Sequence, residues 1–205
     1  MELEALNEKL QKGIQFSRTD LSMNKQGMLT PSQIQTLKNS DVFNGSKTNK
    51  LIIGIAIGGF FLGIAKEGLQ FLSPTLLLSY LGMFALMYGV YYMISKNTLK
   101  KLEEGKITVE KIQGVVNPFY DEKIANSTSI GQYSGVIKTA TNFAGVNYGD
   151  YAYVLEVAGK KLYTTKAIYD SLGKNQEYAI YFVRSTKREY QNMIHGAAIV
   201  SAEAI

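Results

Sequence analysis

The stretch TLLLSYLGMFALMYGVYYMI, residues 75–94, carries no charged side chain. An apolar run of about 20 residues is long enough for an α-helix to cross the ~30 Å hydrocarbon core of a bilayer. Ser73 and Pro74, just before it, are residue types favoured at the cap and at the first position of a helix. Tyr91 and Tyr92, near its end, suit the aromatic belt of a membrane interface. The stretch therefore predicts a transmembrane helix.

A second apolar run, LIIGIAIGGFFLGIA at residues 51–65, lies upstream of the first. As a helix it would be about 23 Å long, which is shorter than the hydrocarbon core. We expect the helix to continue to Leu72, with Lys66 and Glu67 reaching toward the lipid headgroups. The two runs together predict a transmembrane α-helical hairpin over residues 51–104. The alternative is a pair of core helices in a soluble domain, which the rest of the chain has too little apolar sequence to cover.

Basic residues flank the predicted hairpin at both outer ends, whereas its turn holds a single lysine and a single glutamate. Positively charged flanks stay on the cytoplasmic side, so both termini are expected in the cytoplasm of a bacterium, with the hairpin in the inner membrane. The side chains expected to anchor the hairpin at the interfaces are Lys50, Lys66, Tyr91, Tyr92, Lys96, Lys100 and Lys101.

Small residues recur at helix-packing spacing in both runs. Gly-x-x-x-Gly spacing lets two membrane helices approach closely. The residues concerned are Gly54, Gly58, Gly59, Gly63, Gly82 and Gly89. Two interpretations stay open: these glycines let the two spans of one hairpin touch, or they pack against another membrane subunit or a second copy of the chain.

Residues 1–50 are predicted to form a cytoplasmic arm with two short helices. Leu3, Leu6 and Leu10 have helical spacing, which indicates an amphipathic helix over Glu2–Lys12. The run Thr30-Pro31-Ser32-Gln33 is typical of a capping box with proline at the first helical position, opening a helix to about Asn39. The preceding run 24–30 faintly resembles a calcium loop, but its ligand positions lack carboxylates, so a turn is expected there.

From Lys106 onward the apolar pattern alternates, as expected for half-buried strands. Gly105 is expected to end the second helix of the hairpin. Residues 105–205 are predicted to form an all-β soluble domain, a small OB-like or SH3-like barrel or roll, with one short helix over Lys166–Leu172. The expected strands are Lys106–Val116, Ser134–Thr141, Tyr151–Val157, Lys161–Thr165, Glu177–Val183 and Ile194–Ser201, with a turn at residues 158–160.

The composition limits the available chemistry. The chain has no cysteine, which excludes disulfides and thiolate sites, and one histidine, His195, which is too few for a histidine metal cluster. An acid–base pair of His195 with Glu189 or Glu203 is possible in principle, but a lone histidine is more typical of a structural residue. We expect no catalytic residues, no metal and no cofactor. The net charge of +5 is compatible with anionic lipid headgroups or nucleic acid and demonstrates neither. Residues 96–205 carry 14 basic and 11 acidic residues, and because this excess is small we do not expect nucleic acid as a partner.

Three segments carry a resemblance: NKQGMLTPSQ at residues 24–33, YAIYFVRSTK at residues 178–187, and the terminal SAE at residues 201–203. With these segments the chain resembles uncharacterised bacterial two-span membrane proteins that end in a small β domain. In architecture alone it is similar to NfeD-type proteins, in which membrane helices precede an OB-like domain. The resemblance implies a fold and no site.

These observations favour a non-catalytic accessory or scaffolding subunit of a bacterial inner-membrane protein complex. Its partners would be membrane lipids and other membrane subunits or further copies of the chain. The alternative is a membrane-tethered module that binds lipid headgroups, a peptide or nucleic acid.

Overall fold

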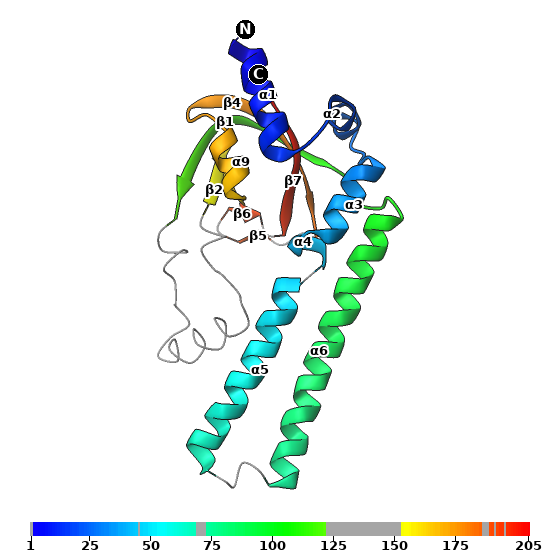
Figure 1. The fold of residues 1–205 in the computed structure, drawn as a ribbon, viewed down its shortest axis with the longest axis vertical. Helices are drawn as coiled ribbons and strands as arrows, with labels where there is room; N and C mark the ends of the chain where they lie inside the picture. Colours follow the sequence, from blue (N-terminus) through cyan, green and yellow to red (C-terminus); the bar gives the residue numbers. More distant parts are fainter. Residues whose placement is uncertain are drawn as a thin grey trace. The chain divides into compact units, whose positions relative to one another are not determined.

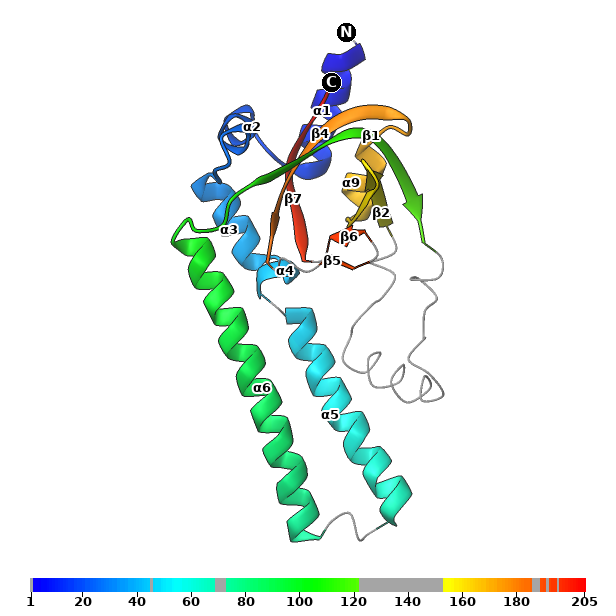
Figure 2. The ribbon, with the colours of Figure 1, turned by 180° about the vertical axis from the view of Figure 1, so that it is seen from behind.

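The computed structural model describes residues 2–44, 46–68, 73–121, 153–185, 189–190, 192–194 and 196–205. The chain divides into two compact units. Of the described residues, unit 1 holds 2–44, 99–121 and those from 153 onward, and unit 2 holds 46–68 and 73–98. Figures 1 and 2 show the elements of both units. Each unit is described separately below.

A curled mixed sheet forms the centre of unit 1 (Figure 1). Within the described residues it has seven strands in the order β5-β6-β3-β2-β1-β4-β7. The pair β3–β6 is parallel, and the other neighbouring strands are antiparallel. The strands are β1 (Glu110–Tyr120), β2 (Tyr153–Val157), β3 (Lys160–Tyr163), β4 (Gln176–Arg184), β5 (Glu189–Tyr190), β6 (Met193–Ile194) and β7 (Ala197–Ala204).

Strand β4 is buried on both of its faces. Its run from Tyr178 to Val183 has no residue more than 3% exposed. Because successive side chains of a strand point to opposite faces, the run feeds two separate cores. Tyr178 and Ile180 join one core cluster, whereas Ala179, Tyr181 and Val183 join another. Both faces of the sheet therefore require a covering layer.

Helices α1 (Glu2–Ile14) and α9 (Lys166–Ser171) cover the first face (Figure 2). Leu10 of α1 and Phe16 just after it lie in the same cluster as Ile180, with Leu6 and Ile14 packed around them. The two helices approach so closely that a Cβ on Gly13 would lie 2.4 Å from the Ser171 Cβ. Glycine at position 13 thus allows the contact between α1 and α9.

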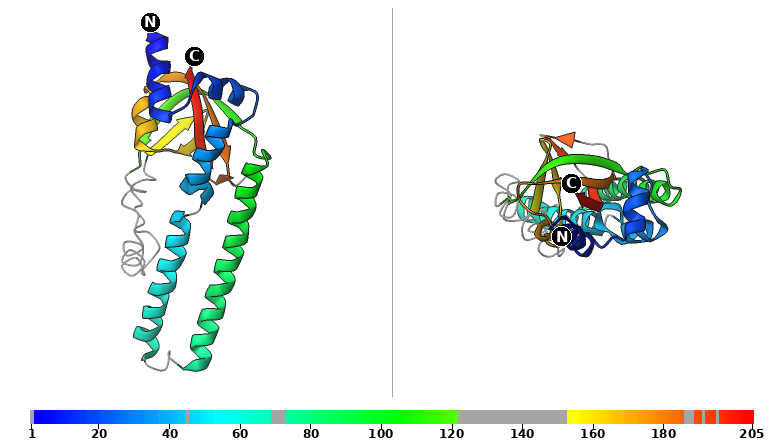
Figure 3. Two further views of the ribbon diagram at one scale, coloured as in Figure 1. Left: turned by 45° about the vertical axis from the view of Figure 1, so that its right-hand side comes forward. Right: turned by 90° about the horizontal axis from the view of Figure 1, so that it is seen from above.

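The second face is covered by residues of α3 (Pro31–Asn39), α4 (Asp41–Asn44) and the last turn of α6 (Pro74–Glu103). Leu37, Phe43 and Leu102 are at most 5% exposed in this cluster. Helix α2 (Arg18–Lys25) connects the two layers. Both α2 and α3 begin with capping boxes, Ser17 with Asp20 and Thr30 with Gln33. Figure 3 shows these elements in two further views.

The last turn of α6 ends in a Schellman motif. Gly105 has a φ of 65°, its N–H donates to the Leu102 carbonyl at 3.2 Å, and the Lys106 N–H donates to the Lys101 carbonyl at 2.9 Å. Glycine tolerates this left-handed conformation without steric cost. The motif places Leu102 in the core while the chain turns toward β1.

Unit 2 contains α5 (Ser46–Glu67) and the part of α6 up to Thr98. The Tyr80 hydroxyl of α6 donates to the Ala56 carbonyl of α5. A Cβ on Gly59 would lie 3.2 Å from the same hydroxyl oxygen, so the glycine leaves room for the tyrosine. Among the described residues, α6 is the one helix long and apolar enough to cross a membrane, and no residue of its most apolar 18-residue stretch is buried.

The sequence expectations are confirmed for α3, α6 and α9 and for strands β2, β3 and β4. Strand β1 spans Glu110–Tyr120 instead of Lys106–Val116, and the strand expected over Ile194–Ser201 is divided between β6 and β7. Helix α6 starts at Pro74 and ends beside Gly105, α3 spans the predicted residues, and the β2–β3 hairpin turns at Ala158 and Gly159. Helix α5 spans Ser46–Glu67, and residues 69–72, over which the helix was expected to continue, lie outside the described residues. Its apolar part, Ala56–Lys66, is shorter than a span, so the hairpin of two spans stays a prediction.

The expectation of an all-β soluble domain needs correction. Residues 2–44, taken from the sequence as a separate arm, belong to the same unit as the sheet and supply side chains to both of its cores. Unit 1 is therefore mixed α and β, and β5 and β7 are the end strands of the sheet that its described residues form. The strand expected at Ser134–Thr141 lies outside the described residues.

Candidate functional site

The outer edge of β7, which pairs with no described strand, is joined to the N-terminal helices by a buried polar cluster, which we call the edge network: Asn24, Gln33 and Ser201. The amides of Asn24 and Gln33 hydrogen-bond each other in both directions at 2.9 Å. Gln33 also donates to the Val200 carbonyl of β7 at 3.0 Å, and Ser201 donates to Asn24 Oδ1 at 2.6 Å. These side chains are at most 8% exposed, and they are satisfied by one another and by the carbonyls of Met28 and Val200, as buried polar groups require.

A second polar cluster fixes the start of α2 against the start of α3. The Asp20 carboxylate accepts hydrogen bonds from the Thr30 hydroxyl and, at 2.8 Å each, from the backbone N–H and the hydroxyl of Ser17. Burial raises the pKa of Asp20, but the hydrogen bonds from Thr30, Ser17 and Ser32 outweigh it, so the pKa lies below its usual value. The cluster therefore favours the ionised carboxylate in the folded chain.

Glu203 of β7 is the third polar centre at this edge. Its carboxylate lies 2.6 Å from Lys25 Nζ and accepts a hydrogen bond from the Tyr181 hydroxyl at 2.9 Å. Burial of Tyr181, together with the hydrogen bond to the nearby carboxylate, raises the pKa of its phenol to about 12. Tyr181 thus stays protonated and acts as a donor, and the arrangement does not prepare it as a base or nucleophile.

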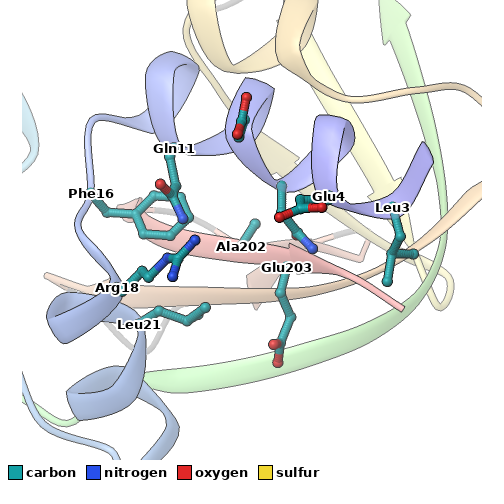
Figure 4. A pocket seen from close by; sticks show the side chains of 10 residues that line it. Leu3, Glu4, Gln11, Phe16, Arg18, Leu21, Ala202 and Glu203 are labelled. Carbon is teal, nitrogen blue, oxygen red and sulfur yellow. The ribbon is translucent and has the colours of Figure 1, made fainter. Parts of the chain in front are cut away.

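A cavity of about 420 Å³, which we call the edge groove, lies between α1, the start of α2 and the end of β7. Figure 4 shows Gln11, Phe16, Arg18 and Leu21 at one end of the groove and Leu3 and Glu4 at the other. Asn7, Glu8, Ala202 and Glu203 complete the lining. The groove thus combines an apolar floor with charged groups of both signs, a composition found in ligand pockets.

A row of aromatic rings extends from β1 to α9 in unit 1. The rings of Tyr120 and Tyr153 have centroids 5.2 Å apart, and those of Tyr153 and Tyr169 are also 5.2 Å apart. Lys161 Nζ lies 5.6 Å from the centroid of the Phe119 ring. Tyr120 is 45% exposed, so the row reaches the surface. Contacts of this kind stabilise the curled end of the sheet.

The candidate packing glycines differ in their described surroundings, and the choice between packing within one hairpin and packing between chains stays a prediction. Gly59 lies against Tyr80 within unit 2. Gly82 and Gly89 have no described atom within 4 Å of a Cβ built on them, so the described part of the chain offers them no partner. In the described helix α5, Gly54 and Gly58 are buried, and Gly63 is half-buried.

The candidate interface anchors lie at the two ends of the apolar segments. Lys66 is exposed near the end of α5, and Tyr91 is half-buried and Tyr92 exposed in α6. Lys96 Nζ lies 6.0 Å from the Tyr92 ring centroid, and Lys100 Nζ lies 3.8 Å from a Glu104 carboxylate oxygen. Lys101 is exposed. The side chain of Lys50 and the whole of His195 fall outside the described residues.

The described residues contain no group of three or more histidine, aspartate or glutamate side chains that could hold a metal ion. Sequence reasoning missed the edge groove, because its lining comes from three separated segments. The sequence predicts a turn over 24–30 and a helix cap from Thr30, whereas the structure shows that Asn24 and Gln33 bond each other and that Asn24 also bonds Ser201 of β7.

Comparison with known proteins places the chain in no family. No family model matches it, and neither a curated protein nor a solved structure does. The resemblance to two-span and NfeD-type membrane proteins therefore stays an expectation from the sequence.

Replacing Gln33 with alanine should lower the free energy of unfolding of the purified full chain by about 1–3 kcal/mol, because Asn24 and the Val200 carbonyl lose their buried partner. Denaturant titration measures the change. Gln113→Ala is the matched control, since the bond that this exposed amide makes to a described side chain is a long one, to Glu177 at 3.4 Å, and it should change stability by less than about 0.5 kcal/mol. Equal effects of the two variants would contradict a stabilising role for the edge network.

Stability should also depend on pH at both extremes. The raised pKa of Tyr181 means that its contribution is complete below about pH 10 and is lost as pH rises through about 12. The lowered pKa of Asp20 means that its contribution is present above its usual pKa and is lost as pH falls through the lower, folded value. Unfolding titrations of Tyr181→Phe between pH 9 and 12, about the range of the phenol shift, should show a shallower loss than the unsubstituted chain. An identical slope would contradict the assignment to Tyr181.

Proposed function

We propose that the protein is a non-catalytic scaffolding subunit of a bacterial inner-membrane complex, anchored by a hairpin of α5 and α6. One observation carries the proposal: no residue of the most apolar stretch of α6 is buried by the described chain. Leu78, Leu86 and Met93 are each 68–71% exposed. An apolar surface of this extent needs lipid or another apolar partner around it.

The helix lengths support the anchor. Helix α6, with 30 residues, is about 45 Å long, more than the ~30 Å of the hydrocarbon core. Helix α5, with 22 residues, is about 33 Å long, but its apolar part, Ala56–Lys66, is shorter than a span, so the anchor rests mainly on α6. The lysines at positions 47, 50, 96, 100 and 101 favour a cytoplasmic location for both termini.

The surface of α6 favours association with a further membrane helix. At 100° per residue, Gly82, Ala85 and Gly89 lie on one side of α6, and Tyr80 and Phe84 lie on the opposite side, toward α5. The small-residue side has no described neighbour at Gly82 or Gly89. Membrane helices associate through such sides because the backbones can approach closely.

The buried polar groups of unit 1 support a structural rather than a chemical role. Asn24 and Gln33 hydrogen-bond each other and the carbonyls of Met28 and Val200, and Asp20 accepts a hydrogen bond from the Thr30 hydroxyl. The OB-like or SH3-like character of the curled sheet is part of this proposal. The second candidate function, a membrane-tethered binding module, is favoured by the edge groove.

The proposal predicts that the chain remains in the membrane pellet after an alkaline carbonate wash and runs in mild detergent as an assembly larger than one chain. The double variant Gly82→Leu, Gly89→Leu should remain in the pellet but run at the size of a single chain. Leucine is a better helix former than glycine, so loss of assembly would not reflect loss of α6.

Met87→Leu is the matched control, because Met87 is 53% exposed but lies away from the small-residue side. It should leave the assembly unchanged. A chain that stays in the supernatant, or an unsubstituted chain that runs alone in detergent, would overturn the proposal.

A further inference from the structure

The outer edge of β7 is closed by side chains at two points. The Ala204 N–H donates to Asn7 Oδ1 at 2.9 Å, and the Val200 carbonyl accepts from Gln33 Nε2 at 3.0 Å. Successive residues of a strand direct their backbone N–H and C=O alternately toward one neighbouring strand and away from it. The Ile205 N–H donates to the Glu177 carbonyl of β4, so the odd-numbered residues at this end of β7 face β4 and the even-numbered ones face outward. Exposed strand edges are commonly protected in this way, since unpaired edges bind other chains.

Ala202 lies between the two closed points and lines the edge groove. By the same alternation, its backbone N–H and C=O point away from β4. No described residue on the outer side of β7 forms a hydrogen bond with them. Ala202 itself is 1% exposed, so a free donor and a free acceptor are buried at the base of the groove. Buried backbone groups normally have partners, so this pair is suited to receiving an amide from outside.

The rest of the lining specifies charge. Glu4, Glu8 and Arg18 are exposed, and none of their side chains has a hydrogen bond or ion pair with a described residue. Glu203 is already paired with Lys25 and Tyr181. The unpaired carboxylates thus outnumber the single guanidinium, and Phe16 and Leu21 provide an apolar surface beside them. The groove therefore favours a ligand with a cationic group and an apolar group.

We propose that the edge groove binds a short extended peptide segment that carries a basic side chain. The peptide amide would pair with the Ala202 N–H and C=O, as in strand addition at a sheet edge, but over a single residue because Asn7 and Gln33 close the edge on either side. The basic side chain would reach Glu4 and Glu8, and an apolar neighbour would contact Phe16. The inference deepens the proposed function, since such a segment would belong to a partner subunit.

The test uses the full chain in detergent and a fluorescein-labelled, blocked pentapeptide that alternates valine and lysine. Fluorescence anisotropy should rise and saturate with protein, and the ¹⁵N-labelled chain should show a shift of the Ala202 amide resonance. The double variant Glu4→Gln, Glu8→Gln should weaken binding about tenfold or more, because charge-assisted hydrogen bonds are lost. Both glutamates are exposed and unpaired among described residues, so the variant should fold.

Two controls make the result specific. Glu177→Gln removes one glutamate charge, where the groove variant removes two, from an exposed position outside the groove and should leave binding unchanged. A pentapeptide that alternates valine and glutamate should bind at least tenfold more weakly than the lysine peptide. Absence of saturable binding, equal binding of both peptides, or a Glu4→Gln, Glu8→Gln variant that binds normally would each overturn the peptide site.

The outcome is separable from that of the membrane proposal. Peptide binding by a chain that runs alone in detergent would support the groove and reject the scaffolding subunit. Assembly without peptide binding would reject the groove and leave the subunit proposal in place.

Discussion

Unit 1 depends on one constraint: β4 is apolar on both faces and must be covered on both. The side chains of Tyr178 and Ile180 require the layer of α1 and α9, and those of Tyr181 and Val183 require the layer of α3, α4 and the last turn of α6. A sheet with only one covering layer would leave half of these groups in water, and each Å² of apolar surface left exposed would cost about 25 cal/mol of folding free energy. The N-terminal segment is therefore an integral part of the fold.

The same constraint places the polar chemistry at the edge of β7. Since α1 and α3 cover opposite faces, the connecting chain must pass around the edge strand, and Asn24 and Gln33 lie where it does so. Their amides satisfy each other and the strand, which stabilises the crossing without an apolar contact. The edge groove reaches β7 at Ala202, between the two points at which Asn7 and Gln33 hydrogen-bond the outer edge of the strand.

Local patterns predicted local structure well. The charge-free run before Lys96, the capping box at Thr30, and the apolar run at 177–183 each correspond to an element of the structure. Helix α2 was missed because its capping box uses Asp20 at the third position instead of Glu or Gln, and because its run is short and polar.

The long-range arrangement could not be predicted in this way. Gln33 and Val200 are separated by 167 positions, and no periodicity in either segment indicates the other. The contribution of Phe16, Leu37 and Phe43 to two cores also depends on tertiary contacts.

The central claim is that the layers of α1 and α3 unfold together with the sheet as one cooperative unit. Native-state amide hydrogen exchange measures this most directly. The account predicts that amides of α1 and α3 exchange with the same opening free energy as those of β4. Exchange of α1 and α3 at a much lower free energy, with β4 still protected, would contradict it.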